Sequence, residues 1–266
     1  MPNHKKITII GGGVMGEIFA ASAVNIFPKY LVMVCDPNVK KLTMLKKKHR
    51  RISTVVNSLS AVKNTQVILL AVKPQSFIEV ARQLQGQVSQ DCLVISIMAG
   101  VNIKKIQKAL GIKKVIRAMP NMGARINKST TVWMASEAVR VYDKKIVRQW
   151  FDSIGFALEV KKETLINSAT AIAGSGPGFF FYLVEEWLKA ASQMGFSQAE
   201  SKKLLFATIA GANELLQKFG APEILKQQVA SKGGTTEIGL RVMSKTVPAM
   251  WRRTLAVALK RAQELS

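Results

Sequence analysis

The feature that most restricts the fold of this chain is the glycine pattern Gly11-x-Gly13-x-x-Gly16, which follows the apolar run Ile7–Ile10 and precedes a helical pattern. Glycines at this spacing between a strand and a helix are typical of a dinucleotide-binding turn. They allow a tight turn and let backbone N–H groups approach a pyrophosphate. The pyrophosphate charge also suits a helix N-terminus. We therefore expect a strand, turn and helix that bind a dinucleotide.

The first 160 or so residues alternate short β-branched runs with longer helical patterns. The runs that predict strands are Ile7–Ile10, Tyr30–Cys35, Val67–Val72, Leu93–Met98, Lys114–Ala118, Thr130–Met134 and Phe156–Val160. Such alternation predicts a mainly parallel sheet with helices on both faces. The expected fold class is therefore α/β, with a doubly wound, Rossmann-type N-terminal domain.

After Lys161 the strand signals stop, which predicts an all-helical second half. Ser197 offers an N-cap with Glu200 at the capping-box spacing. A first helix is expected over residues 177–195, and a second begins after the Ser197 cap. Further helices are expected over residues 222–229, 235–243 and 246–266. We place a domain boundary near Lys161, with a dinucleotide-binding domain over residues 1–161 and a helical dimerisation and substrate-binding domain over 162–266.

The helical half is unusually apolar. The runs Phe179–Val184 and Leu204–Ala212 are hydrophobic nearly all round, and a helix of that kind must be covered on every side. An intertwined homodimer would supply the cover, since obligate dimer interfaces resemble a core cut in half. Coverage by the sheet domain is the alternative. Assembly beyond a dimer is left open.

The charge of the chain is the outlier of its composition, with 39 Lys and Arg against 16 Asp and Glu and a net charge of +23. A balance of this kind raises the hypothesis of nucleic-acid binding. The basic residues are mostly scattered pairs, however, and only Lys46–Arg51 forms a block. Dispersed charge is usually a solvated surface. We therefore do not expect a nucleic-acid partner, although the surplus favours anionic cofactors and substrates.

Other functional classes are disfavoured by composition. No apolar run approaches the roughly 20 residues of a membrane-spanning helix, and the first apolar run breaks into three glycines, unlike a signal peptide. The two cysteines, Cys35 and Cys92, lie in apolar stretches, which argues against disulfides and fits the reducing cytoplasm. With two histidines and no carboxylate cluster at ligand spacing, no metal is expected.

A second glycine-rich segment, Ala230–Thr236, resembles a small-anion pocket. Its adjacent glycines let backbone N–H groups converge on a carboxylate, and its two threonines add hydroxyl donors where a helix could begin. A chain with one site for a dinucleotide and another for a small acid suggests a reductase.

Residues at the ends of other predicted strands are candidates for contact with the cofactor. Asp36 lies 20 residues after Gly16, where a carboxylate can accept from both ribose hydroxyls of NAD. Asn38, Lys40 and Lys41 follow, and could instead hold the 2′-phosphate of NADP if the carboxylate turned away. A third reading makes Asp36 a turn residue before Pro37.

Two further segments place a proline just after a strand, in the crevice where cofactors bind. They are Ala71-Val72-Lys73-Pro74 and Arg117-Ala118-Met119-Pro120-Asn121. Lys73 is a candidate for a phosphate or ribose contact, and Asn121 for the nicotinamide amide. Either segment could also be an ordinary loop.

Taken in order, the motifs of this chain resemble those of the pyrroline-5-carboxylate reductases, which catalyse the last step of proline biosynthesis. The matching segments are Gly11–Gly16, Ala71–Pro74, Ser96–Gly100, Arg117–Asn121, Gly174-Ser175-Gly176-Pro177 and Ser231–Thr236. The resemblance runs over almost the whole chain. It implies a Rossmann-type domain, a helical dimerisation domain, and reduction of a cyclic imine carboxylate by NADPH or NADH.

The resemblance also implies roles for individual residues. Of the candidate cofactor residues, it implies that Gly13–Met15 touch the pyrophosphate and that Val72 and Lys73 line the cofactor cleft. With those argued above, the residues expected to bind the cofactor are Gly11, Gly13, Val14, Met15, Gly16, Asp36, Asn38, Ala71, Val72, Lys73, Pro74, Ala99 and Asn121. Ser231, Gly234, Thr235 and Thr236 would bind the substrate carboxylate and ring nitrogen, with the hydroxyl of Thr236 nearest the nitrogen. Glu163 matches an acidic position of the family and is expected to help close the site.

The chain departs from the family pattern at three places. Lys232 replaces a loop proline, Met122-Gly123 replaces Thr-Pro, and Gln227-Gln228 stands where an acidic residue or asparagine is common. These departures leave the fold prediction untouched. They bear on the affinity for the substrate and, to a lesser degree, on its identity.

The expected reaction is reduction of 1-pyrroline-5-carboxylate to L-proline. An imine is readily protonated near neutral pH, so positioning does much of the catalysis and no strong general base is needed. The helix after Pro177 carries no lysine before Lys189, which favours imine over alcohol chemistry. The alternatives are a relative that reduces another cyclic imine, and a basic nucleotide- or nucleic-acid-binding protein without catalysis.

Overall fold

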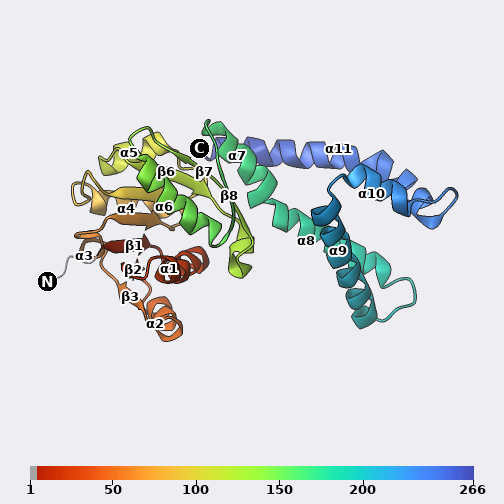
Figure 1. Cartoon of the computed structure of the whole chain (residues 1–266), viewed down its shortest axis with the longest axis horizontal. Coiled ribbons are helices and arrows are strands. Elements are labelled where there is room, and N and C mark those ends of the chain that lie inside the picture. The colour runs from red at the N-terminus through yellow and green to blue at the C-terminus, as the bar shows by residue number, and fades with distance from the viewer. Residues whose placement is uncertain (1–4) are drawn as a thin grey trace. The chain divides into compact units, whose positions relative to one another are not determined.

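The computed structural model describes residues 5–266, so residues 1–4 of the segment weighed above as a signal peptide lie outside it (Figure 1). The chain forms two compact units. The first contains residues 5–177 together with Ala258–Ser266, and the second contains Gly178–Val257. The compact units therefore divide at Pro177, whereas the boundary of the two domains near Lys161 stays a prediction.

The first unit is built on an eight-stranded sheet with the order β3-β2-β1-β4-β5-β6-β7-β8. The strands are β1 Lys6–Ile10, β2 Leu31–Cys35, β3 Ile52–Val55, β4 Val67–Leu70, β5 Leu93–Ser96, β6 Val115–Met119, β7 Ser129–Ala135 and β8 Gly155–Glu159. All neighbours pair parallel except β6 and β7, which are antiparallel. The doubly wound fold is confirmed, and every predicted strand is present. The sequence analysis missed β3, which forms an edge of the sheet.

Apolar side chains cover both faces of the sheet, as expected for parallel strands joined by helical crossovers. One core cluster joins the sheet to α1 Val14–Ile26 and α6 Val141–Asp152, with Phe19 and Trp150 edge to face at 5.5 Å between ring centroids. The cluster on the other face includes residues of α3 Ser58–Val62, α4 Phe77–Leu84 and α5 Ile103–Leu110. Helix α2, Val39–Lys48, contacts β3. After β8 come α7, Thr164–Ala169, and one π-helical turn, Thr170–Gly174.

The second unit is entirely helical. Its helices are α8 Gly176–Ala191, α9 Gln198–Phe219, α10 Pro222–Val229 and α11 Thr235–Glu264, of which α8 begins and α11 ends in the first unit. The predicted capping box is present: Ser197 accepts from the Glu200 N–H, and Glu200 accepts from the Ser197 N–H. Helix α8 ends at Ala191, before Gly195 rather than at it.

The prediction of two helices after Thr235 was wrong, because α11 is one helix of 30 residues with Pro248 inside it. Proline removes one backbone hydrogen bond from a helix interior, a cost that tertiary packing can outweigh. Within this unit, Trp251 of α11 lies edge to face with Phe179 of α8, at 6.3 Å between ring centroids. Packing near the proline therefore favours a continuous helix.

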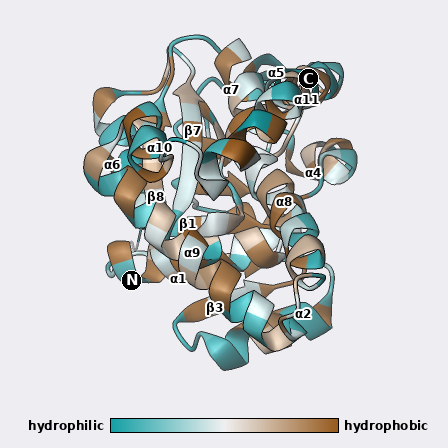
Figure 2. Ribbon diagram, turned by 90° about the vertical axis from the view of Figure 1, so that its right-hand side faces the viewer, coloured by the Kyte–Doolittle hydropathy of each residue, from teal (hydrophilic) through white to brown (hydrophobic). Residues whose placement is uncertain are grey.

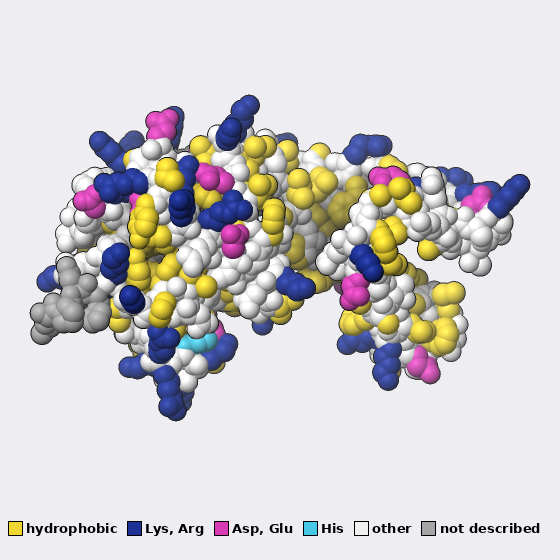
Figure 3. Space-filling model, in the orientation of Figure 1, with side chains coloured by type: hydrophobic (Ala, Val, Ile, Leu, Met, Phe, Trp, Pro, Cys, Tyr) yellow, Lys and Arg dark blue, Asp and Glu magenta, His cyan; other side chains and the backbone are white. Residues whose placement is uncertain are grey.

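Helices α8 and α9 carry many hydrophobic residues (Figure 2), and the space-filling view shows hydrophobic side chains at the surface of this unit (Figure 3). Phe181 is 59% exposed, Trp187 53% and Phe206 46%. These side chains, with others, line a groove of about 780 Å³ on this unit. Over residues 5–266 no helix is long and apolar enough to cross a membrane.

Candidate active site

The glycine turn lies where β1 ends, between β2 and β4. Gly11 has φ +107°, a conformation that favours glycine, and its N–H donates to Cys35 O. A Cβ on Gly11 would lie 2.6 Å from Ala71 O, and one on Gly16 would lie 1.9 Å from Gly11 O. A Cβ on Gly13 would meet nothing within 4 Å. The turn therefore needs glycine at positions 11 and 16 for its own packing, and stays open at position 13.

The start of α1 keeps free donors. Within the described part of the chain, the backbone N–H groups of Gly13, Val14 and Met15 have no acceptor, and Gly13 caps the helix without a side chain. Free N–H groups at a helix N-terminus attract a phosphate. The residues at this turn thus fit the pyrophosphate of a dinucleotide.

Asp36 is fixed at the end of β2. Its side chain accepts the N–H of Gly12 at 2.8 Å and the N–H of Asn38 at 2.9 Å, and the residue is only 6% exposed. The Nζ of Lys41 lies 3.7 Å from the same carboxylate. Asn38 caps α2 by accepting the Lys41 N–H. The carboxylate therefore does not turn away into solvent, as one of the sequence interpretations required.

The other predicted cofactor residues follow the carboxyl ends of β4, β5 and β6, on the same edge of the sheet as the glycine turn. Lys73 and Pro74 are exposed, and Ala99 is half-buried. Pro74 and Gly100 contribute to a pocket of about 600 Å³ whose wall includes Arg82, Lys105 and Lys108. The structure thus brings these segments to the edge where ligands of doubly wound sheets bind.

Asn121 has structural partners for its whole side chain. Its Oδ1 accepts the N–H groups of Gly123 and Thr130, both at 3.1 Å, and its Nδ2 donates to Ala173 O at 3.0 Å. The side chain thereby ties the loop after β6 to the π-helical turn. We therefore do not propose that it contacts the nicotinamide amide.

The second glycine-rich loop joins α10 to α11 in the helical unit. Gly233 has φ +73°, and the Gly234 N–H donates to Ser231 O at 2.9 Å to close the turn. The hydroxyls of Ser231, Thr235 and Thr236 have no hydrogen-bond partner among the described residues, and neither do the N–H groups of Thr235 and Thr236. The loop therefore carries free donors at a helix N-terminus, as the sequence predicted. The Gly234 N–H is not one of them, because the turn uses it.

Glu163 is engaged in a partly buried network that sequence reasoning missed. Its Oε1 accepts from Arg117 Nη1 at 3.0 Å and from the N–H of Ile103, the first residue of α5, at 2.8 Å. Arg117 is 2% exposed and also donates to Asn167 Oδ1 at 2.9 Å. The signal was an arginine inside an otherwise apolar strand, since a buried charge needs partners. These contacts give Glu163 a structural role, and its expected part in closing the site stays a prediction.

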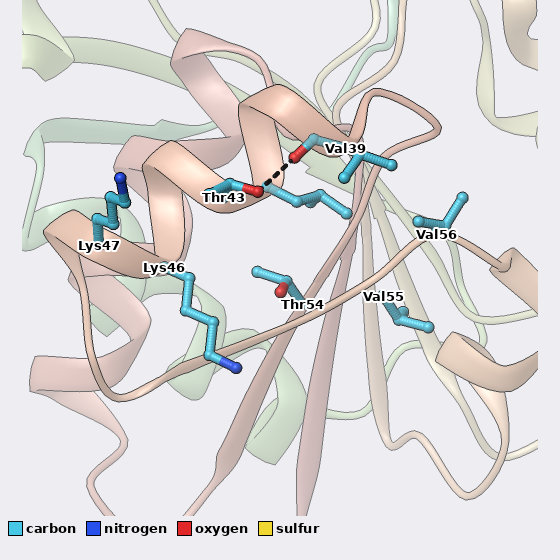
Figure 4. A pocket seen from close by; sticks show the side chains of 8 residues that line it. Val39, Thr43, Lys46, Lys47, Thr54, Val55 and Val56 are labelled. Atoms are coloured by element: carbon cyan, nitrogen blue, oxygen red, sulfur yellow. Dashed lines mark hydrogen bonds between the residues drawn. The ribbon is translucent and has the colours of Figure 1, made fainter.

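A further pocket, of about 420 Å³, lies between α2 and β3 (Figure 4). Val39, Val55 and Val56 line it beside Lys46 and Lys47, and the Thr43 hydroxyl donates to Val39 O at 2.9 Å. None of the predicted cofactor residues lines this pocket. It is therefore not assigned to the active site.

A doubly wound sheet with a dinucleotide turn, followed by a helical unit with a donor-rich loop, defines a Rossmann-type oxidoreductase. Residues 6–100 match the family described as NADP oxidoreductase coenzyme F420-dependent, and residues 163–265 match the pyrroline-5-carboxylate reductase dimerisation family.

Relatives and solved structures narrow the class. The chain is 34% identical to pyrroline-5-carboxylate reductase 2 of Bacillus subtilis over 90% of this chain and 87% of the relative, and 32% identical to the Synechocystis reductase over 98% of each. A Plasmodium falciparum pyrroline carboxylate reductase solved with NADP bound matches with a TM-score of 0.86 at 26% identity, covering 99% of this chain and 98% of that one. The chain belongs to the pyrroline-5-carboxylate reductase family.

Proposed function

We propose that this protein reduces 1-pyrroline-5-carboxylate to L-proline with NADPH as hydride donor and NADH as an alternative donor. The observation that carries the proposal is the set of free hydroxyl and amide donors at Ser231–Thr236, in a chain whose relatives bear the name of this reductase. The resemblance predicted from the motifs is confirmed by the family matches. NADP(H) as cofactor is supported by the NADP-bound relative.

The residues at the glycine turn fit the dinucleotide. The N–H groups of Gly13, Val14 and Met15 would hold the pyrophosphate, and Val72 and Lys73 would line the cleft. When bound, the cofactor supplies a hydride to the imine carbon, which becomes C5 of proline, while the ring nitrogen keeps the proton of the iminium.

The residues of the second loop would bind and orient the substrate. Its carboxylate would accept from the Ser231 hydroxyl and from the free N–H of Thr235, and the Thr236 hydroxyl would lie nearest the ring nitrogen. Because the imine is protonated near neutral pH, these groups need to position the ring rather than to supply a strong base. Donors at a helix N-terminus also favour the negative charge of the carboxylate.

The structure explains one position among the departures from the family pattern, Gly123. A Cβ on Gly123 would lie 2.2 Å from Lys128 O, so this loop has no room for a proline there. Lys232 is exposed and has no acidic partner among the described residues, which leaves its charge available to an anion. Gln227 and Gln228 are exposed on α10, and nothing in the structure explains them.

The helical unit is proposed to form a homodimer. The match to a dimerisation family covers residues 163–265, and α8 and α9 expose apolar side chains over the groove described above. A second copy of the chain would cover these side chains. We keep a cytoplasmic location as a proposal, since Cys35 and Cys92 are both unpaired and buried.

The experiment that tests the function is consumption of NADPH on addition of 1-pyrroline-5-carboxylate. Formation of L-proline in equal amount would support the proposal. Absence of turnover with a folded, NADPH-binding protein would reject it, and a panel of other cyclic imine carboxylates would then test the diverged alternative.

A further inference from the structure

Glu237 stands in the first turn of α11 and contacts the substrate loop from the helix side. Its Oε2 accepts the N–H of Gly233 at 2.6 Å. Its Oε1 accepts from Arg241 Nη2, one helical turn further on, at 2.9 Å. The three residues thus form a chain of hydrogen bonds from the helix surface to the loop backbone.

The Gly233 N–H is the point where the loop needs support. Gly233 adopts the left-handed conformation, with φ +73°, and nothing lies within 4 Å of where its Cβ would be, so the loop faces open space on that side. The next amide, that of Gly234, is already bonded to Ser231 O. The contact from Glu237 therefore fixes a second loop amide, next to the one that the internal turn fixes.

The charge of Glu237 needs a partner because the loop is expected to receive a carboxylate. The Gly233 N–H and the Arg241 guanidinium hold the pKa of Glu237 below its usual range, so the side chain is ionised at neutral pH. An unpaired carboxylate at this place would repel the carboxylate of the substrate. Arg241 lies on the same face of α11, four residues on, and neutralises it.

We propose that Glu237 and Arg241 are positioning residues of the substrate loop: Glu237 fixes the Gly233 backbone, and Arg241 orients Glu237 and offsets its charge. The inference rests on the proposed function, because it assigns the loop to the imine carboxylate. Neither side chain is proposed to touch the reacting atoms.

The test compares Glu237→Ala, which removes the acceptor, with Glu237→Gln, which keeps an oxygen acceptor for the Gly233 N–H but removes the charge. For Glu237→Ala we expect the KM for 1-pyrroline-5-carboxylate to rise about tenfold, the scale of one lost hydrogen bond to a charged group. The same KM in Glu237→Gln should stay within about threefold of the wild-type value. Arg241→Met should raise the same KM about three- to tenfold, because it leaves Glu237 unbalanced.

The matched control is Glu185→Ala on α8. Glu185 and Lys189 have the same four-residue spacing and a distance of 2.8 Å, but no loop amide is involved. This variant should leave kcat and KM unchanged. In every variant the KM for NADPH should be unchanged, and thermal unfolding should show a folded protein.

The outcomes separate this inference from the proposed function. An inactive wild type would reject the function itself. With an active wild type, a Glu237→Ala variant with normal KM overturns the inference. A Glu237→Gln variant whose KM rises as much as that of Glu237→Ala also overturns the inference, since the effect would then come from the charge and not from the hydrogen bond.

Discussion

The backbone N–H of Gly12 donates to the Asp36 carboxylate at 2.8 Å, and this bond joins the glycine turn to the end of β2. The same side chain accepts the Asn38 N–H at 2.9 Å. Asp36 is therefore a fixed carboxylate at the place where the adenosine ribose of a dinucleotide is expected. Its effect on cofactor choice depends on the cations around it.

NADPH is predicted to be narrowly preferred over NADH, with both accepted. A fixed carboxylate opposes a 2′-phosphate, but Lys41 Nζ lies 3.7 Å from that carboxylate, and Lys40, the preceding residue, is exposed. Two cations and the positive field of the chain should outweigh one carboxylate. The check is kcat/KM for the two cofactors at fixed ionic strength. A preference for NADH above about tenfold, or ~1.4 kcal/mol, would show that Asp36 dominates.

Lys41→Met should shift the ratio of the two dissociation constants toward NADH by about three- to tenfold, because the 2′-phosphate loses a cation. Fluorescence titration of the protein with NADPH and with NADH measures it without turnover. Lys47→Met on the same helix is the control, since Lys47 is far along α2 from the N-cap. Equal ratios in the two variants would rule out a specific role for Lys41.

Thr236→Ala is expected to lower turnover by roughly one to two orders of magnitude, the usual scale for a positioned hydrogen-bond donor. Affinity for NADPH should barely change. Thr236→Ser keeps the hydroxyl and should retain most of the activity. Wild-type turnover in Thr236→Ala would remove this hydroxyl from the mechanism.

Sedimentation should detect no stable monomer at micromolar concentration, because α8 and α9 expose apolar side chains that a second copy would cover. Phe181→Glu, at a side chain 59% exposed and lining the groove, should weaken the dimer. Activity should fall with it if the site depends on assembly. A fully active, well-folded monomer would contradict the proposed dimer.

Glu163→Ala should lower the free energy of unfolding by about 3 kcal/mol, since it leaves the buried Arg117 guanidinium without its acidic partner. Glu163→Gln should lower the free energy of unfolding by less, because its amide oxygen can still accept from Arg117 and from the Ile103 N–H. Urea unfolding followed by circular dichroism measures both. If the two variants were as stable as wild type but lost turnover, Glu163 would belong to the reaction after all.

Local patterns were sufficient to predict most of the fold. Seven apolar runs became strands within a residue or two of their predicted ends, because each carries side chains that pack into the core of the sheet. Strand β3 was not predicted because Ser53 and Thr54 interrupt its apolar character and a basic block precedes it. The break expected between Met243 and Thr246 is absent, because packing between residues distant in the sequence, such as Phe179 and Trp251, favours one continuous helix.

The glycine-rich loops of the candidate site were likewise predictable, but the partners of their side chains were not. The bonds from Asp36 to Gly12, from Glu163 to Arg117 and from Asn121 to Ala173 join residues 24, 46 and 52 positions apart. Sequence spacing carries no information on such contacts. They give Glu163 and Asn121 structural partners that sequence reasoning did not foresee, and they fix the carboxylate of Asp36.

The three glycines of the turn would be retained for different reasons in a relative that no longer binds a cofactor. Positions 11 and 16 are closed by the chain's own backbone, so a descendant without any ligand would still have to retain glycine there in order to fold. Position 13 faces open space, so a side chain there would clash with a bound ligand but not with the protein itself. A bulky side chain at position 13, in a sequence that otherwise keeps the fingerprint, would mark a pseudoenzyme of this family.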